Sequence, residues 1–144
     1  MIVLDTNVIS EMVRLMPDMR VFHWLDAQVT TTLFTTTITE AELLYGVTVL
    51  PPGQRRNWLA DALASILADG FPDRILPFDS DAAQHSATIR ATRKNTGCPI
   101  GQHDAQIAAI ARSHGAKLAT RNVDDFTNCG IELINPWEYT PPPE

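Results

Sequence analysis

The chain has 144 residues, 44% of them hydrophobic, and a formal net charge of −6 at pH 7. This length and apolar content suffice for a single domain with one core. The excess of acids argues against a protein that holds nucleic acid by overall charge alone. It leaves open a nuclease whose acids gather at a metal site. No run of about 18 apolar residues occurs, which excludes a transmembrane helix and a membrane partner.

The first residues predict a buried strand, IVL at 2–4, that ends directly on Asp5. A carboxylate in this place lies at the carboxyl end of a strand, where open α/β sheets bind their ligands. The amino terminus lacks the basic region, apolar stretch and small-residue cleavage site of a secretory signal. We therefore expect a cytoplasmic protein, whose two cysteines, Cys98 and Cys129, are reduced.

Strand and helix patterns alternate along the rest of the chain. The further strands are predicted at residues 30–39, 74–78, 117–120 and 131–135. Helical patterns cover residues 21–25 and 41–49, run from about 55 to 70, and follow residues 79–81 and 104. The alternation predicts an α/β fold, a central and mainly parallel sheet with helices on both faces. We expect one domain over residues 1–138 and a flexible, proline-rich tail over 139–144.

Two of the helices carry more detailed expectations. In the helix at 41–49 the apolar residues Ala41, Leu44 and Tyr45 look core-facing, which places Glu42 at the border of a buried stripe. An acid in that position needs a partner, whereas Glu40 is expected to be a first-turn acid favoured by the helix dipole. In the helix at 55–70, Trp58 belongs to the apolar stripe.

Acids stand beside apolar elements in four segments, VLDTN, ITEAELLYG, QHDAQIAAIA and TRNVDDF. If the strands at 2–4 and 117–120 are parallel members of one sheet, Asp5 and the loop at 121–126 emerge at the same edge. Each acid also has a simpler explanation. Asp5 could cap Asn7 or Val8 at the end of its strand, Asp104 could be a helix N-cap, and Asp124 or Asp125 could be a solvated turn acid.

A set of converging carboxylates would repel one another and raise each other's pKa unless a cation lay among them. Carboxylate and water oxygens are the ligands that Mg²⁺ and Mn²⁺ prefer. Such an ion binds a phosphate oxygen, lowers the pKa of a bound water and stabilises charge as the P–O bond breaks. The acids therefore suggest metal-assisted hydrolysis of phosphodiester bonds.

Four segments together carry a family resemblance: LDTNVISE, ITEAELLYGV, PIGQHDAQIAA at 99–109, and LATRNVDDF. In this order they resemble the PIN-domain ribonucleases, and among these the VapC-type toxins of type II toxin-antitoxin pairs. The resemblance implies a PIN-like α/β/α sandwich that cleaves RNA, typically tRNA or rRNA, with Mg²⁺ or Mn²⁺. It implies that Asp5, Glu42 and Asp104 bind the metal, and that the Thr6 hydroxyl steadies the site.

The resemblance is less direct at the fourth acid. Many relatives carry an acid directly after the T-R pair, where this chain has Asn122, while Asp125 matches the acid that precedes Phe. The family pattern thus implies Asp125 as the fourth catalytic acid and Asn122 as a supporting residue that adds no charge. It further implies a homodimer and a cognate antitoxin whose carboxyl-terminal segment covers the groove.

Several basic residues have two interpretations. Arg121 lies beside the predicted site, where it could contact a substrate phosphate or form an ion pair with Asp124 or Asp125. A basic cluster near the end of one helix could contact RNA or complement the helix dipole. Its members are Arg90, Arg93 and Lys94.

Two rival functions were weighed against the toxin hypothesis. The first is a non-catalytic PIN-fold module that binds RNA or protein and holds a structural ion, which the uncharged Asn122 would suit. The second is a small Mg²⁺ phosphatase with an aspartate nucleophile. That chemistry favours a second aspartate two residues after Asp5, where this chain has Asn7.

Overall fold

The computed structural model describes all residues, 1–144. Five short strands form one sheet in the order β3-β2-β1-β4-β5, and every neighbouring pair is parallel. The strands are β1 (Ile2–Leu4), β2 (Leu33–Thr36), β3 (Ile75–Leu76), β4 (Lys117–Ala119) and β5 (Leu133–Ile134). The predicted parallel sheet is confirmed, and β1 lies at its centre with β4 as its neighbour.

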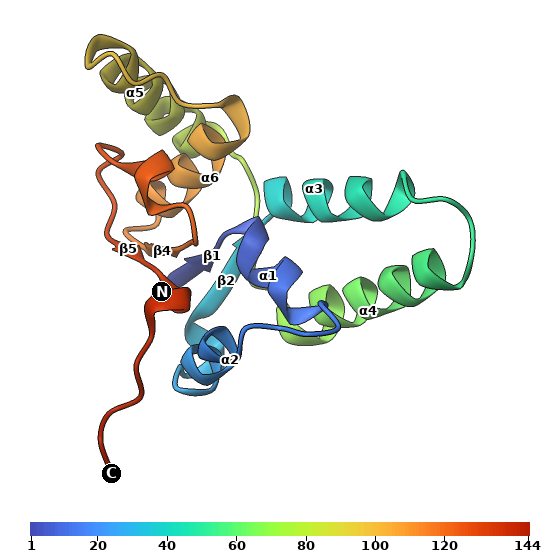
Figure 1. Cartoon of the computed structure of the whole chain (residues 1–144). Helices are drawn as coiled ribbons and strands as arrows, with labels where there is room; N and C mark the ends of the chain where they lie inside the picture. The colour runs from blue at the N-terminus through green and yellow to red at the C-terminus, as the bar shows by residue number, and fades with distance from the viewer.

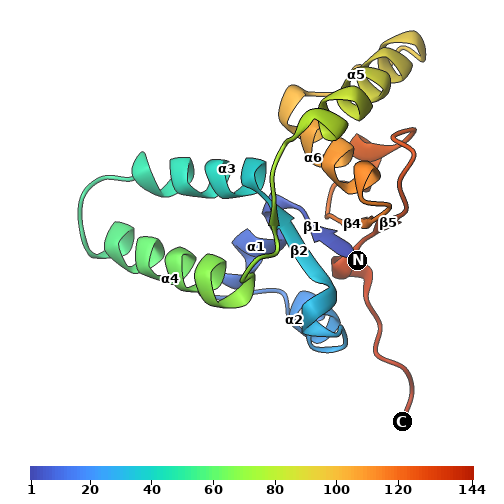
Figure 2. The same cartoon turned by 180° about the vertical axis from the view of Figure 1, so that it is seen from behind.

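Helices cover both faces of this sheet, as Figures 1 and 2 show from opposite sides. The helices are α1 (Thr6–Met12), α2 (Met19–Asp26), α3 (Thr37–Thr48), α4 (Gln54–Gly70), α5 (Ser80–Asn95) and α6 (Gln102–Ser113). The pair α5 and α6 lies on one side, and α1 to α4 lie on the other, with α3 and α4 projecting as a hairpin. The predicted α/β/α sandwich is thereby confirmed.

Alternate side chains of the central strands divide between two apolar clusters, because successive residues of a strand point to opposite faces. Val3 and Leu118 belong to a cluster that contains the apolar residues of α5 and α6. Leu4 and Ala119 belong to a second cluster with residues of α1 to α4. Each helical layer thus has its own core, and the edge of the sheet where β1 and β4 end lies between the two layers.

The threonine-rich segment at 30–39 forms three elements instead of the single predicted strand. A 3₁₀-helix covers Thr30–Thr32, β2 covers Leu33–Thr36 and α3 begins at Thr37. The Thr36 side chain accepts a hydrogen bond from the Thr39 amide at 3.1 Å and so caps α3. Threonine suits both a strand and a helix cap, and its abundance could not separate the two.

The helix α1 has no counterpart among the predicted helices. It follows β1 without a loop, and Asp5 is its N-cap, with a side chain that accepts from the Thr6 amide at 2.8 Å. The interpretation of Asp5 as a cap is therefore confirmed, but the amide that its side chain binds belongs to Thr6 and not to Asn7 or Val8. It does not exclude a further role, because the second carboxylate oxygen is free of this bond.

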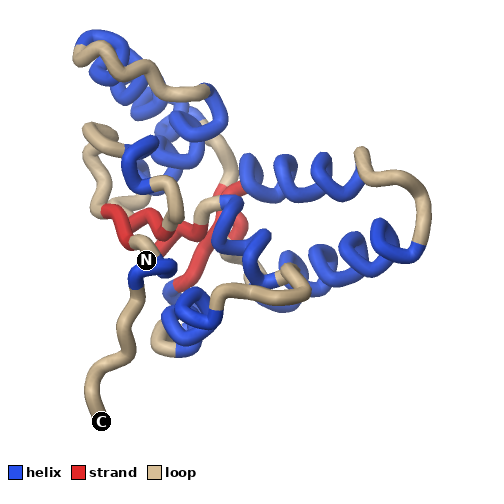
Figure 3. The backbone as a smooth tube through the Cα atoms, in the orientation of Figure 1, coloured by secondary structure: helices blue, strands red, loops and turns tan.

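The outer faces of the α3–α4 hairpin differ from the sequence prediction. On α3, Thr39 and Leu43 are buried, whereas Ala41, Leu44 and Tyr45 are exposed, so their predicted core-facing orientation is wrong. On α4, Leu63 and Leu67 are buried, while the Trp58 side chain is 50% exposed. The hairpin projects from the sheet (Figure 3), so each helix buries only the face turned towards its partner and the sheet.

No helix in the structure combines the length and the apolar character needed to cross a lipid bilayer. After a 3₁₀-helix at Pro136–Glu138, residues 139–144 contain neither helix nor strand, and they lead away from the sheet in Figure 1. Tyr139 still packs against the second cluster. The flexibility of the tail and the boundary at residue 138 stay predictions.

Candidate active site

The carboxyl ends of β1 and β4 hold Asp5 from two sides. Leu4 pairs with Ala119 across the two parallel strands, so the next residues, Asp5 and Thr120, are neighbours. The Thr120 hydroxyl donates to Asp5 Oδ2 at 2.7 Å, and the Thr6 amide donates to Asp5 Oδ1 at 2.8 Å. Asp5 is only 5% exposed, and both of its oxygens are fixed by hydrogen bonds.

Thr120 also ties the segment after β4 to α1. Its hydroxyl oxygen accepts from the Asn122 amide at 3.1 Å and from Asn7 Nδ2 at 3.5 Å. Asn7 Oδ1 in turn accepts from the Arg121 amide at 3.3 Å. Sequence reasoning missed Thr120, although one signal was present. A polar residue directly after β4 must lie beside the residue that follows β1 when the two strands are parallel neighbours.

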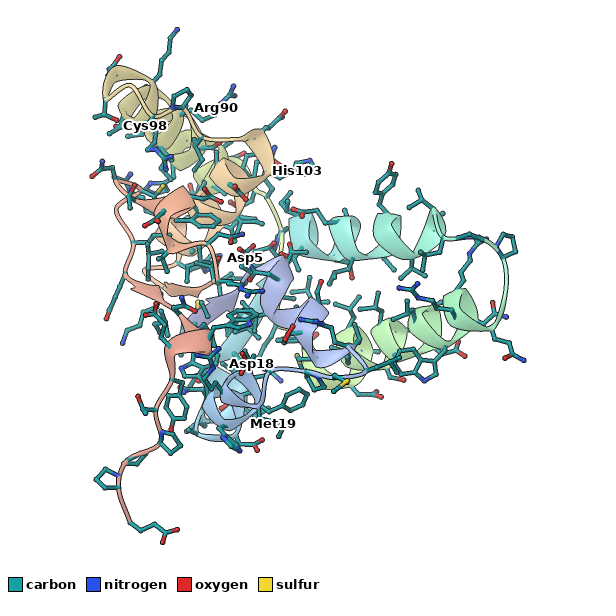
Figure 4. All side chains as sticks on the ribbon, viewed as in Figure 1. Asp5, Asp18, Met19, Arg90, Cys98 and His103 are labelled. Atoms are coloured by element: carbon teal, nitrogen blue, oxygen red, sulfur yellow. The ribbon has the colours of Figure 1, made fainter.

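Glu42 and Asp104 come to the same place from α3 and α6. Together with Asp5 they line a cavity of about 420 Å³. Figure 4 shows Asp5 where the two helical layers meet, with His103 at the start of α6 on the same side. Asp104 lies in the first turn of α6, but the N-cap is Gly101, so the N-cap interpretation of Asp104 is wrong. The three predicted metal-binding acids therefore share one cavity.

The pKa of each of these acids lies above its ordinary value. Burial is the largest cause of the raised pKa for Asp5, and Thr120 and Thr6 oppose it through their hydrogen bonds, while the charges of Glu42 and Asp125 raise it further. Burial also raises the pKa of Glu42 and of Asp104. Asp104 adds to the rise for Glu42, and Asp5 and Asp125 add to the rise for Asp104, while His103 lowers both. The acids thus repel one another across the cavity.

One oxygen of the site has no hydrogen-bond partner in the protein. Glu42 Oε1 is buried and accepts no hydrogen bond, and His103 Nδ1 lies 3.7 Å from it. An unpaired buried carboxylate oxygen beside two further carboxylates suits a hard divalent cation. The side chains do not converge into a compact cluster of three metal ligands.

The remaining predicted site residues differ in how close they come. Thr6 lines the cavity and its hydroxyl lies 3.1 Å from the Thr39 hydroxyl. Asn122 also lines the cavity, whereas Asp125 is exposed and does not. The Asp125 charge nevertheless raises the pKa of both Asp5 and Asp104. The structure therefore brings Asn122 into the cavity wall. Asp125 lies outside the wall and acts on Asp5 and Asp104 only through its charge.

The cavity wall also contains residues that sequence reasoning did not select. They are Asn7, Ser10, Glu11 and Trp137. Glu11 is buried and satisfied by two bonds from Arg14 and one from the Asp18 amide, which makes it a structural acid.

Arg121 lines the same cavity, and its guanidinium lies 5.4 Å from the centre of the Trp137 ring. The alternative ion pair of Arg121 with Asp124 or Asp125 is not formed and was wrong. Because the Arg121 side chain is exposed, its guanidinium is accessible to a bound phosphate.

The predicted basic cluster at the end of α5 also needs correction. Arg90 and Lys94 are exposed, but Arg93 is buried, with 5% of its surface accessible. Its guanidinium donates to backbone carbonyls instead of facing solvent. Arg93 therefore cannot contact RNA as the sequence interpretation allowed.

Residues 2–130 match the PIN domain family. The chain is 44% identical over 138 residues to the VapC ribonuclease Y4jK of Sinorhizobium fredii, a similarity that covers 96% of this chain and 99% of the relative. The crystal structure of FitAcB from Neisseria gonorrhoeae superposes with a TM-score of 0.91 and 40% identity, over 96% of this chain and 100% of that chain.

A structure from Mycobacterium tuberculosis, VapBC-5 of the VapBC family of toxin-antitoxin systems, superposes with a TM-score of 0.67 and 28% identity, over 92% and 95% of the two chains. The family match spans strands β1 to β4 and every residue of the acidic cavity except Trp137. The chain therefore belongs to the PIN-domain family, among the VapC-type toxins of toxin-antitoxin systems.

Proposed function

We propose that the protein is an endoribonuclease toxin whose activity depends on Mg²⁺ or Mn²⁺ held by Asp5, Glu42 and Asp104. The observation that carries the proposal is the cavity itself. Three acids, one directly after β1 and the others on α3 and α6, line it, and one of their buried oxygens, Glu42 Oε1, has no hydrogen-bond partner in the protein. When bound, the cation would supply Lewis acidity towards a phosphate oxygen and a water of lowered pKa.

The protein residues around the acids have separate tasks in this proposal. Thr120 and the Thr6 amide hold Asp5 in one orientation. The backbone amide of Asn122 donates a hydrogen bond to the Thr120 hydroxyl, and Asn122 presents an uncharged polar side chain at the cavity wall. Asp125, which does not line the cavity, supplies a fourth negative charge from outside it, consistent with its effect on the pKa of Asp104.

Arg121 is the residue we expect to contact the RNA backbone. Its guanidinium lies over the Trp137 ring, and both residues line the cavity together with the three acids. An arginine stacked on an aromatic ring keeps its N–H donors available for a phosphate. A phosphate bound there would place a neighbouring phosphodiester near the three acids.

The partners follow from the family and from the surface. A VapC-type toxin is controlled by a cognate antitoxin, and the homodimer stays a prediction. The exposed apolar residues Leu44 and Tyr45 on α3 and Val49 at its C-cap support it, because they offer an unpaired apolar surface. A nuclease that acts on tRNA or rRNA works where these RNAs are, so we expect it to act in the cytoplasm.

The test is cleavage of labelled total tRNA and rRNA by antitoxin-free protein, with and without Mg²⁺ or Mn²⁺. Discrete cuts that require a metal, and that Asp5→Asn and Glu42→Gln abolish, are expected. Glu40→Gln is the matched control, because Glu40 lies in the first turn of the same helix and does not line the cavity. Folded wild-type protein that cuts neither RNA with either metal would favour the non-catalytic module with a structural ion.

A further inference from the structure

One buried cation lies behind the candidate site. Among the lysines and arginines only Arg93, on α5, is buried. A charge in this position is costly unless its donors are satisfied. None of the ion pairs in the structure involves Arg93. Its side chain must therefore be held by other acceptors.

These acceptors are backbone carbonyls from two separate segments. Arg93 Nε donates to Cys98 O at 2.6 Å, and Nη1 donates to Asp125 O at 2.7 Å and to Thr127 O at 3.0 Å. Nη1 also lies 3.8 Å from Cys129 Sγ. One guanidinium thus joins α5 to the loop at 96–101 and to the turn at 123–129.

Both segments lead directly to residues of the site. The loop at 96–101 enters α6, whose first turn carries Asp104. The turn contains Asp125 and follows Asn122. The part of this turn after Phe126 is irregular, with Asn128 and Gly130 at positive φ, and the sheet does not pair with it. Phe126 and Cys129 of this turn are buried in the apolar cluster of α5 and α6. Hydrogen bonds from Arg93 to the carbonyls of Asp125 and Thr127 fix the backbone on either side of Phe126.

We propose that Arg93 is a positioning residue of the nuclease site. It fixes the turn at 123–129, which follows Asn122 and contains Asp125, against the loop at 96–101 that leads to Asp104. The inference rests on the proposed function, since it takes these residues to act in cleavage. Arginine suits the task because its planar fork aims several N–H groups in fixed directions. A lysine keeps the charge but has one nitrogen, while Arg93 uses two nitrogens to reach Cys98 and Asp125.

The experiment compares Arg93→Lys and Arg93→Met with Arg90→Met, a matched control on the exposed side of the same helix. For each protein kcat and KM for RNA cleavage, Tm and hydrogen exchange are measured. We expect kcat of Arg93→Lys to fall about 10- to 100-fold, as for a catalytic group misplaced by about 1 Å. The KM of Arg93→Lys should equal that of the wild type, because the variant leaves Arg121 unchanged. Amides at 122–127 and 98–101 should exchange faster than the sheet.

Asp104→Asn, measured in parallel, separates this inference from the proposed function. If Asp104→Asn abolishes cleavage while folded Arg93→Lys retains the wild-type kcat, the positioning role is refuted and the proposed function stands. If Asp104→Asn cleaves normally, the proposed function fails, and hydrogen exchange still decides whether Arg93 holds the turn. Failure of both Arg93 variants to fold would overturn the proposal, because the residue would then support the whole fold.

Discussion

The substitution Asp104→Asn tests the electrostatics of the cavity most directly. Asp104 is half-buried, and its pKa is raised by burial and by the charges of Asp5 and Asp125, while no hydrogen bond contributes to it. The carboxamide therefore removes a charge without breaking a bond. The loss of an acid from the first turn of α6 costs about 0.3 to 1 kcal/mol. Relief of repulsion acts in the opposite direction, so metal-free Asp104→Asn should be at least as stable as wild type at pH 7.

The contribution of Asp104 to folding stability should change with pH in a definite direction. An acid whose pKa is raised on folding contributes stability that is fully present below its unfolded value and is lost as pH rises through its folded value. For Asp104 that window begins at 3.8 and extends upward. The difference in Tm between metal-free Asp104→Asn and wild type should therefore grow in favour of the variant as pH rises from about 4.

Bound metal should reverse the order of stability, so that the wild type becomes more stable than Asp104→Asn. A ligand at 100 times its Kd stabilises the folded state by about 2.7 kcal/mol. With about 2.1 cal/mol/K of unfolding entropy per residue and 144 residues, the wild-type Tm should rise by about 9 °C. If Asp104→Asn weakens metal binding about 100-fold, the same concentration should raise its Tm by only about 1 °C.

Scanning calorimetry with and without Mg²⁺, between pH 4 and 8, measures both effects. Asp81→Asn is the control, because Asp81 occupies the first turn of α5 and is exposed. A rise in Tm with Mg²⁺ that is equal in Asp104→Asn and wild type would refute the assignment of Asp104 as a metal ligand. A Tm difference that stays constant with pH would refute the repulsion argument.

Three further outcomes are expected. Glu42→Gln should remove RNA cleavage, measured on labelled tRNA, while Glu40→Gln retains it; equal activity of the two variants would contradict the role of the unpaired oxygen. Arg121→Ala should raise KM about tenfold, because a charge-assisted hydrogen bond contributes about 1.5 to 3 kcal/mol; Arg20→Ala, which removes an exposed arginine paired with an aspartate, should not. Thr120→Val should lower the free energy of unfolding in urea by about 1 to 3 kcal/mol, and an unchanged midpoint would show that the hydroxyl is dispensable.

The convergence of the acids could be predicted from sequence because it depends on strand direction. Alternating strands and helices imply a parallel sheet, and parallel strands deliver the residues that follow them to one edge. Asp5 after β1 and the segment after β4 obey this rule. The short helix α1 was missed, because seven residues give too few turns for an apolar period to be recognised. Its only signal was Asp5, which marks a strand end and a helix cap equally well.

The side chains that the sequence misplaced share one physical cause. Periodicity identifies an apolar stripe but not the surface that covers it, so Leu44 and Tyr45 on the projecting hairpin were assigned to a core that does not reach them. Thr120 and Arg93 were overlooked as site residues for a related reason. Their partners include backbone N–H and C=O groups, which every residue carries, so no pattern of residue types records these bonds. The acids of the cavity leave a motif in the chain, whereas the residues that hold their segments in place become visible only through the path of the backbone.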